Sequence, residues 1–305
     1  MAEAIKGIDA ESLQKWKKAG EITARALDFA MHLCKDGALL LEFAEKVEAK
    51  MVQLGGKPAF PINISMNHVA AHYTPYPNDK TEFNGQLVKI DVGVHVDGFI
   101  GDSAITVDLG KSHDDLVKAS RKALDDAVKI IKPGIKLGEI GEAIESAIKA
   151  YGFVPIKNLS GHGLGVYGLH TGLTIPNFNT GEDEELNEGM VVAIEPFATD
   201  GAGFVVESSN AEIFSLVQKK PVRSMITREI MGEIGKYNGM PFTTRWLAQK
   251  FPLFKVNFAL KELNSADSIR LYPPLVEKNK GMVSQAEHSI IVRKDKPLVL
   301  TQAED

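Results

Sequence analysis

The chain has 305 residues, of which 44% are hydrophobic and 25% charged, a composition typical of a globular protein with a sizeable core. The formal net charge of −5 argues against nucleic acid as a main partner, because such a partner favours a basic face. The sequence contains no 18-residue apolar run, so no membrane association is expected. The single cysteine, Cys34, cannot form an internal disulfide, which indicates a reducing compartment and predicts a cytoplasmic protein.

A repeated segment organises the first half of the chain. Residues 26–55 recur as residues 123–152 at a constant offset of 97, with eleven identities in thirty positions and no gap. Each copy is typical of a helix, a break at Lys-x-Gly and a second amphipathic helix that ends at glycine. Two unrelated helical pairs of similar composition are the alternative, and the gapless register disfavours it.

An alternating apolar segment after the first copy predicts a β-hairpin. Residues 88–107 alternate in hydrophobicity around a central Asp-Gly dipeptide, a strong signal for a two-residue turn. Such a turn places Gly93 opposite Asp102, and strand periodicity then puts Asp91 on the same face as Asp102. Two carboxylates this close repel each other unless a cation lies between them. Taken alone, this pair is as well explained by ordinary acids near a turn.

Three further polar residues interrupt strand patterns in the second half. His162 lies between two glycines, where the backbone can approach a ligand closely. Glu195 ends the apolar segment 190–195, which is expected to turn at an Asp-Gly and return as a second hairpin like the first. Glu287 opens the apolar strand that leads to residue 293. Each alone is more simply structural, but together with the two aspartates they favour a metal site between two similar α+β halves.

Residues 219–272 break the pattern of the second half. The segment is punctuated by prolines and predicts helices at 226–236, 243–250 and 256–265. We expect a helical subdomain inserted between two strands whose ends lie close together.

The candidate ligands constrain the cofactor. Four carboxylates and one imidazole form an oxygen-rich set that suits Mn, Fe or Co better than a closed thiolate zinc site. Four acids are too many for one divalent ion, so two divalent metal ions are expected, with Co, Mn, Fe and Zn all open.

With these residues in view, the sequence resembles the pita-bread metallopeptidases and, within them, the type 2 methionine aminopeptidases of the short archaeal form. The family's ligand order of Asp, Asp, His, Glu, Glu is matched by Asp91, Asp102, His162, Glu195 and Glu287. Longer strings carry the similarity: Ala59-Phe-Pro-Ile-Asn, Ala70-Ala-His72-Tyr-Thr-Pro75, Asn158-Leu-Ser-Gly-His162, Leu169-His170, Tyr272-Pro-Pro-Leu275 and Gln285-Ala-Glu287-His288. The resemblance implies one pita-bread catalytic domain over 1–305, an α+β fold duplicated about a pseudo-twofold axis. Its inserted helical subdomain, 219–272, is the hallmark that separates type 2 from compact type 1 enzymes.

The resemblance also implies an activity. It implies removal of the initiator methionine from the N-termini of nascent polypeptides by a monomeric enzyme, with ribosome association left open. His72 and His170 are implied as catalytic histidines that contact substrate, and Glu195 as a ligand that also accepts a proton. The remaining substrate contacts are implied to be Phe60, Leu169 and Tyr272.

Two other functions fit parts of the pattern. A proline-directed aminopeptidase or prolidase shares the five ligands, but such enzymes usually carry a separate N-terminal domain and lack the helical insertion. A non-catalytic binding protein on the same fold is the other alternative, and such relatives have lost metal ligands that are all present here.

Overall fold

The repeated segment folds as two matching pairs of helices. The computed structural model describes residues 7–208 and 210–302. The first pair is α1 (Ala10–Leu33) and α2 (Leu40–Gln53), and the second is α3 (Asp114–Ile130) and α4 (Leu137–Ala150). At the Lys-x-Gly breaks, Gly37 and Gly134 take φ values of 81° and 82°, a left-handed conformation that glycine adopts without steric cost. The helix–break–helix prediction is confirmed for both copies.

The first hairpin has the predicted register. It is formed by β4 (Leu87–Val96) and β5 (Phe99–Asp108), which pair antiparallel with Val96 opposite Phe99 and Gly93 opposite Asp102. Both turn residues have positive φ, as a primed two-residue turn requires. Three short strands precede the hairpin: β1 (Lys57–Pro58), β2 (Asn63–Met66) and β3 (Val69–Ala71). Of these, β1 and β2 pair with β4.

The second half differs from the prediction after Glu195. The strands are β6 (Val154–Pro155), β7 (Ser160–Gly163), β8 (Thr174–Pro176), β9 (Val191–Ile194), β10 (Phe197–Thr199), β11 (Val205–Glu207) and β12 (Ile213–Leu216). β9 pairs with β7 and with β17 (His288–Ile291), whereas β10 pairs with β6 and β16 (Val283–Gln285). The predicted second hairpin is therefore wrong, because Pro196 has no N–H and the ladder of β9 ends before it.

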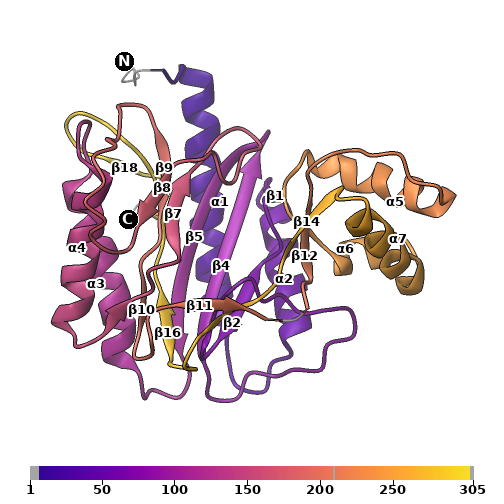
Figure 1. The fold of residues 1–305 in the computed structure, drawn as a ribbon, viewed down its shortest axis with the longest axis horizontal. Helices are drawn as coiled ribbons and strands as arrows, with labels where there is room; N and C mark the ends of the chain where they lie inside the picture. The colour runs from indigo at the N-terminus through magenta and orange to yellow at the C-terminus, as the bar shows by residue number, and fades with distance from the viewer. Residues whose placement is uncertain (1–6, 209, 303–305) are drawn as a thin grey trace.

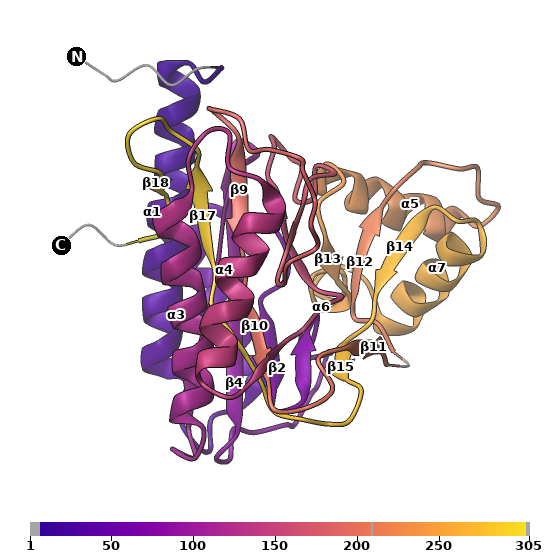
Figure 2. The same ribbon diagram turned by 60° about the vertical axis from the view of Figure 1, so that its left-hand side comes forward.

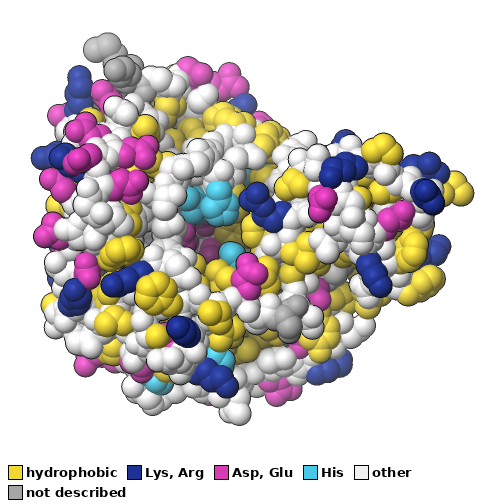
Figure 3. Space-filling model, viewed as in Figure 1, with side chains coloured by type: hydrophobic (Ala, Val, Ile, Leu, Met, Phe, Trp, Pro, Cys, Tyr) yellow, Lys and Arg dark blue, Asp and Glu magenta, His cyan; other side chains and the backbone are white. Residues whose placement is uncertain are grey.

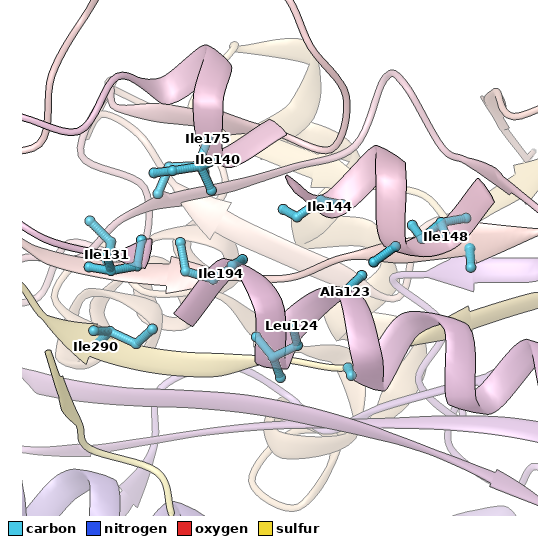
Figure 4. Packing of buried hydrophobic residues seen from close by; sticks show 14 of the residues in the cluster. Ala123, Leu124, Ile131, Ile140, Ile144, Ile148, Ile175, Ile194 and Ile290 are labelled. Atoms are coloured by element: carbon cyan, nitrogen blue, oxygen red, sulfur yellow. The ribbon is translucent and has the colours of Figure 1, made fainter. Parts of the chain in front are cut away.

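Helices cover one side of the strands and leave the other side open (Figures 1 and 2). In the larger core, α3 and α4 pack on β9 and β17 through buried aliphatic side chains, several of which are drawn in Figure 4: Ala123, Leu124, Ile131, Ile140, Ile144, Ile148, Ile175, Ile194 and Ile290. Each fully buried leucine or isoleucine of this kind stabilises the fold by about 1.5–3 kcal/mol. A second core between α1, α2 and β4 contains Cys34, and burial raises the pKa of this thiol to about 12. The two halves thus have separate cores and share the open face.

A group of helices extends from the open face, at the right of Figure 1. It comprises α5 (Met225–Ile234), a 3-10 turn (Gly235–Tyr237), β13 (Phe242–Thr243), α6 (Thr244–Ala248) and α7 (Leu253–Ser265), which have a hydrophobic cluster of their own. The group lies between β12 and β14 (Ile269–Tyr272), which pair antiparallel, so its two ends are adjacent as expected. The chain then passes through β15 (Leu275–Glu277) and ends after β18 (Leu298–Val299). Among the helices of the described residues, none is long and apolar enough to cross a membrane.

Candidate metal centre and substrate cavity

The five predicted ligands lie beneath one cavity. Asp91 is on β4, Asp102 on β5 and His162 on β7, whereas Glu195 directly follows β9 and Glu287 directly precedes β17. All five side chains line the same cavity. The strands of both halves therefore bring together acids and a histidine that are distant in the sequence.

Backbone and serine contacts hold Asp102 and Glu287 side by side. The Ser103 hydroxyl donates to the carbonyl oxygen of Glu287 at 2.7 Å, and the Glu287 N–H donates to the carbonyl oxygen of Ala104 at 3.0 Å. The Ser289 hydroxyl accepts from the Asp102 N–H and donates to the Asp102 carbonyl oxygen, both at 2.8 Å. These bonds hold Glu287, at the start of β17, against the first hairpin.

The distances between the candidate ligating atoms are close to those expected between ligands of one metal ion. His162 Nε2 is 3.7 Å from Asp102 Oδ2 and 3.6 Å from Glu195 Oε1. One ligating atom each from Asp102, His162 and Glu287 lie within 4.8 Å of one another. Nitrogen and oxygen ligands bind such ions at about 2.0–2.2 Å, so ligands of one ion lie roughly 3–4 Å apart.

The electrostatics of the buried acids favour a bound cation. Burial raises the pKa of Asp91, and burial together with neighbouring carboxylates raises the pKa values of Asp102, Glu195 and Glu287. Buried oxygens of Asp91, Asp102 and Glu287 have no hydrogen-bond partner, while Gln285 Nε2 donates to Glu195 at 3.4 Å. Buried carboxylates without partners are costly unless a cation neutralises them, so this donor set fits divalent metal ions.

Two further histidines line the cavity above the acids. The rings of His162 and His170 lie 4.3 Å apart, and His72 packs edge-on against Tyr272 with ring centroids 5.7 Å apart. Burial lowers the pKa of His72 to about 4 and also lowers that of His170. Both imidazoles are therefore neutral near pH 7, and each offers one N–H donor and one acceptor nitrogen.

The remaining walls of the cavity are mostly apolar. The cavity has a volume of about 310 Å³, and Figure 3 shows histidine and acidic side chains gathered in a hollow between the strands and the protruding helices. The side chains of Phe60, Leu169, Ile213 and Tyr272 line it, and the Tyr272 hydroxyl lies 3.1 Å from the Ser215 hydroxyl. An apolar cavity with a few convergent polar groups is typical of a small-molecule or side-chain binding site.

The structure brings together all the site residues named from the sequence, and it adds amides for which the sequence indicated no role, among them Gln285 and Asn63. Gln285 contacts the Glu195 carboxylate, and Asn63 lines the cavity and contacts the backbone of His72. Both belong to strings that carry the family resemblance, so the strings located them without indicating a role.

The chain is similar to curated proteins over almost its whole length. It is 47% identical over 287 residues to the methionine aminopeptidase of Thermococcus onnurineus, which covers 93% of this chain and 97% of that protein. It is 44% identical over 293 residues to the enzyme of Pyrococcus abyssi, covering 95% of this chain and 99% of the relative. The methionine aminopeptidase of Archaeoglobus fulgidus is 46% identical over 287 residues, covering 93% and 97%.

The fold is shared with solved structures. The structure of a thermophilic Arx1 superposes with a TM-score of 0.85 at 19% identity, covering 98% of this chain and 93% of that one. The Thermotoga maritima methionine aminopeptidase gives 0.71 at 24% identity, covering 98% and 100%. The Pyrococcus furiosus prolidase gives 0.61 at 21% identity, covering 98% of this chain and 66% of that one. Residues 14–223 match metallopeptidase family M24. With a duplicated fold, a cluster of acids and a histidine that could hold metal, and this level of identity, the chain belongs to the methionine aminopeptidases of metallopeptidase family M24.

Proposed function

We propose that this chain is a metallo-aminopeptidase that removes the N-terminal methionine from nascent proteins. The observation that carries the proposal is the meeting of five side chains suited to bind metal, of which Asp102, His162 and Glu287 are buried, with an apolar-walled cavity. The full-length identity to methionine aminopeptidases supports this reaction over that of a prolidase.

The residues that would hold two divalent ions are Asp91, Asp102, His162, Glu195 and Glu287. Hydrogen bonds between β5 and the start of β17 fix Asp102 and Glu287 side by side, so both would contribute to the same centre. When bound, a metal pair supplies Lewis-acid activation of water and charge stabilisation at the reacting carbonyl.

Proton transfer falls to groups of the chain itself. Glu195 lines the cavity beside the other acids and accepts the proton of the attacking water. His170 and His72 face the cavity as neutral imidazoles, so each can donate a hydrogen bond to the developing oxyanion, or take up a proton on its free nitrogen and release it to the leaving amine.

The apolar part of the cavity receives the methionine side chain. Phe60 and Tyr272 offer aromatic rings to the thioether sulfur, and Leu169 offers an aliphatic wall. His170, adjacent to Leu169 in sequence, also lines the cavity, and its ring lies 4.3 Å from that of His162, so it is placed to contact the scissile bond of a bound N-terminal methionine.

We assign the enzyme to type 2 and treat residues 1–305 as one catalytic domain with 219–272 as an inserted subdomain. The helices of that segment and the adjacent strands β12 and β14 support the assignment. We further propose that the enzyme acts in the cytoplasm as a monomer on N-termini of nascent chains, with ribosome association as an open part of this proposal. Neither nucleic acid nor membrane is a proposed partner.

The test is hydrolysis of Met-Ala-Ser and of a matched X-Pro peptide by chelated protein, with Mn, Fe, Co or Zn added back. We expect methionine release that depends on added metal, and no cleavage of the X-Pro peptide. Preferential X-Pro cleavage would transfer the assignment to a proline-directed peptidase. Folded, metal-binding protein that cuts neither peptide would identify a binding protein.

A further inference from the structure

His72 has an unusual backbone for a residue in a binding cavity. It follows directly on β3 and takes φ 65°, the left-handed region that a non-glycine residue adopts only at a steric cost. Its ring faces the cavity and packs against Tyr272. A strained conformation of this kind persists only where neighbouring groups hold it.

Asn63 supplies the group that holds it. The His72 N–H donates to Asn63 Oδ1, a side-chain oxygen on β2, at 2.8 Å. Beside this point the Ile64 N–H donates to the carbonyl oxygen of Tyr73 at 2.7 Å, and the Tyr73 N–H donates to the Ser65 hydroxyl at 3.4 Å. At His72 itself, the Asn63 side chain accepts the backbone N–H.

The amide of Asn63 is itself fixed in orientation. Asn63 is 5% exposed, and its Nδ2 donates to the carbonyl oxygen of Pro61 at 2.9 Å. The amide oxygen must therefore face His72, because the nitrogen is the only atom of the amide that can donate to Pro61. Asparagine opposite Asp91 on β4 also avoids adding another carboxylate beside the buried acids.

We propose that Asn63 is a positioning residue that acts through His72: its side-chain oxygen holds the His72 backbone in the left-handed conformation that aims the imidazole into the cavity. This role rests on the proposed function, in which His72 contacts the reacting groups. Asn63 itself does not need to touch the substrate.

The first test is a double-mutant cycle of Asn63→Ala and His72→Ala, with Met-Ala-Ser as substrate. Misplacing a reacting group by about 1 Å costs on the order of 100-fold in rate, so we expect Asn63→Ala to lower kcat by about 10–100-fold while KM changes little. In the His72→Ala background the same substitution should have no further effect on kcat. Equal losses of kcat in both backgrounds would mean that Asn63 acts elsewhere, and would overturn the proposal.

The matched control is Asn67→Ala. Asn67 also has a positive φ and uses its Oδ1 to accept from a backbone N–H, that of Leu87, but it does not line the cavity. We expect this variant to lose thermal stability and keep its kcat. A loss of kcat like that of Asn63→Ala would mean that the segment of β2 and β3 as a whole, not the Asn63 contact, sets the activity.

A second readout is independent of catalysis. Hydrogen exchange at the His72 amide should be faster in Asn63→Ala than in the parent protein, and Mn affinity should be unchanged. If Asn63→Ala does not fold, Asn63→Ser serves instead, because its shorter side chain cannot reach the same N–H. Unchanged protection of the amide would refute the contact itself. Protein that fails to cut Met-Ala-Ser but loses protection in the variant would refute only the proposed function.

Discussion

Arg245 on α6 forms a two-pronged ion pair with Glu48 on α2, with nitrogen–oxygen distances of 3.0 and 2.9 Å. Both side chains are buried. Arg245 Nε also donates to the carbonyl oxygen of Pro75, and the indole of Trp246 donates to Glu48 at 2.9 Å. This network holds the protruding helices against the first repeat. It also holds in place Pro241, which forms part of the cavity wall.

Breaking the pair should loosen the inserted helices. Replacing Glu48 with Gln leaves a buried guanidinium without its counter-charge, so we expect the free energy of unfolding to fall by about 3–5 kcal/mol. Urea denaturation measures this loss. Glu45→Gln, an exposed acid on the same helix, is the control and should change stability by less than about 0.5 kcal/mol. Equal effects in the two variants would contradict a special role for the pair.

Asp102→Asn should abolish methionine release without lowering the stability of the metal-free protein. In the metal-free protein the substitution removes a carboxylate that burial and Asp91 make unfavourable, so the melting temperature should stay level or rise. Metal at about 100 times its dissociation constant stabilises a folded protein by roughly 2.7 kcal/mol, and this gain should be lost in the variant together with methionine release. Calorimetry with and without Mn gives both values.

The control is Asp125→Asn, on the exposed side of α3, which should behave like the parent. If Asp102→Asn is still stabilised by metal, Asp102 is not a metal ligand.

Gly93→Ala should narrow the cavity. A Cβ at Gly93 would lie 2.1 Å from the ring of Phe60, closer than atoms can approach, so the ring must move. Overpacking of this kind costs about 1–3 kcal/mol, and displacement of Phe60 should raise KM for Met-Ala-Ser by about tenfold. Gly232→Ala on α5 is the control, because nothing lies within 4 Å of the added atom. An unchanged KM in Gly93→Ala would show that the Phe60 ring does not bound the methionine site.

His95 should make the fold sensitive to acid. Burial lowers its pKa to about 4, and its Nδ1 accepts from the Gly98 N–H at 3.1 Å. Between about pH 6.5, the unfolded value, and pH 4, the unfolded chain binds a proton that the folded protein does not, so stability falls as pH falls through this window.

The loss attributable to His95 is at most about 3 kcal/mol. His95→Asn removes the titrating group, so the fall in melting temperature between pH 7 and pH 4.5 should be smaller than in the parent. His32→Asn, at an exposed position on α1, should leave that fall unchanged. A parallel fall in the parent and in His95→Asn would assign the acid sensitivity to other groups.

Local patterns predicted much of the fold. The repeat predicted the second helix of each copy, and α2 and α4 begin and end at the same offset of 97. The offset also holds for β1 and β6 and for β2 and β7, which lie beyond the repeated residues and were not predicted. The Asp-Gly turn fixed the register that puts Gly93 opposite Asp102, because a two-residue loop leaves no slack.

The pairing between strands that are distant in the sequence was not predicted. β9 pairs with β17 across the inserted helices, and no local pattern encodes a partner so far along the chain. For the site, composition and spacing indicated acids that need a cation, while His72 and His170 came from the family resemblance alone. Asn63 was missed because its contact with His72 depends on a single left-handed residue that no periodicity reveals.

The position of β17, which pairs with β9 and is hydrogen-bonded to β5, also has a consequence for how the chain folds during its synthesis. The strands that carry Asp91, Asp102 and His162 are synthesised well before Glu287, yet Glu287 is clasped to the first hairpin by Ser103 and Ser289. A growing chain therefore lacks part of the proposed set of metal-binding side chains until this strand has been made. If these side chains hold metal as proposed, metal binding would be completed late in folding, and the ions would link the two repeats.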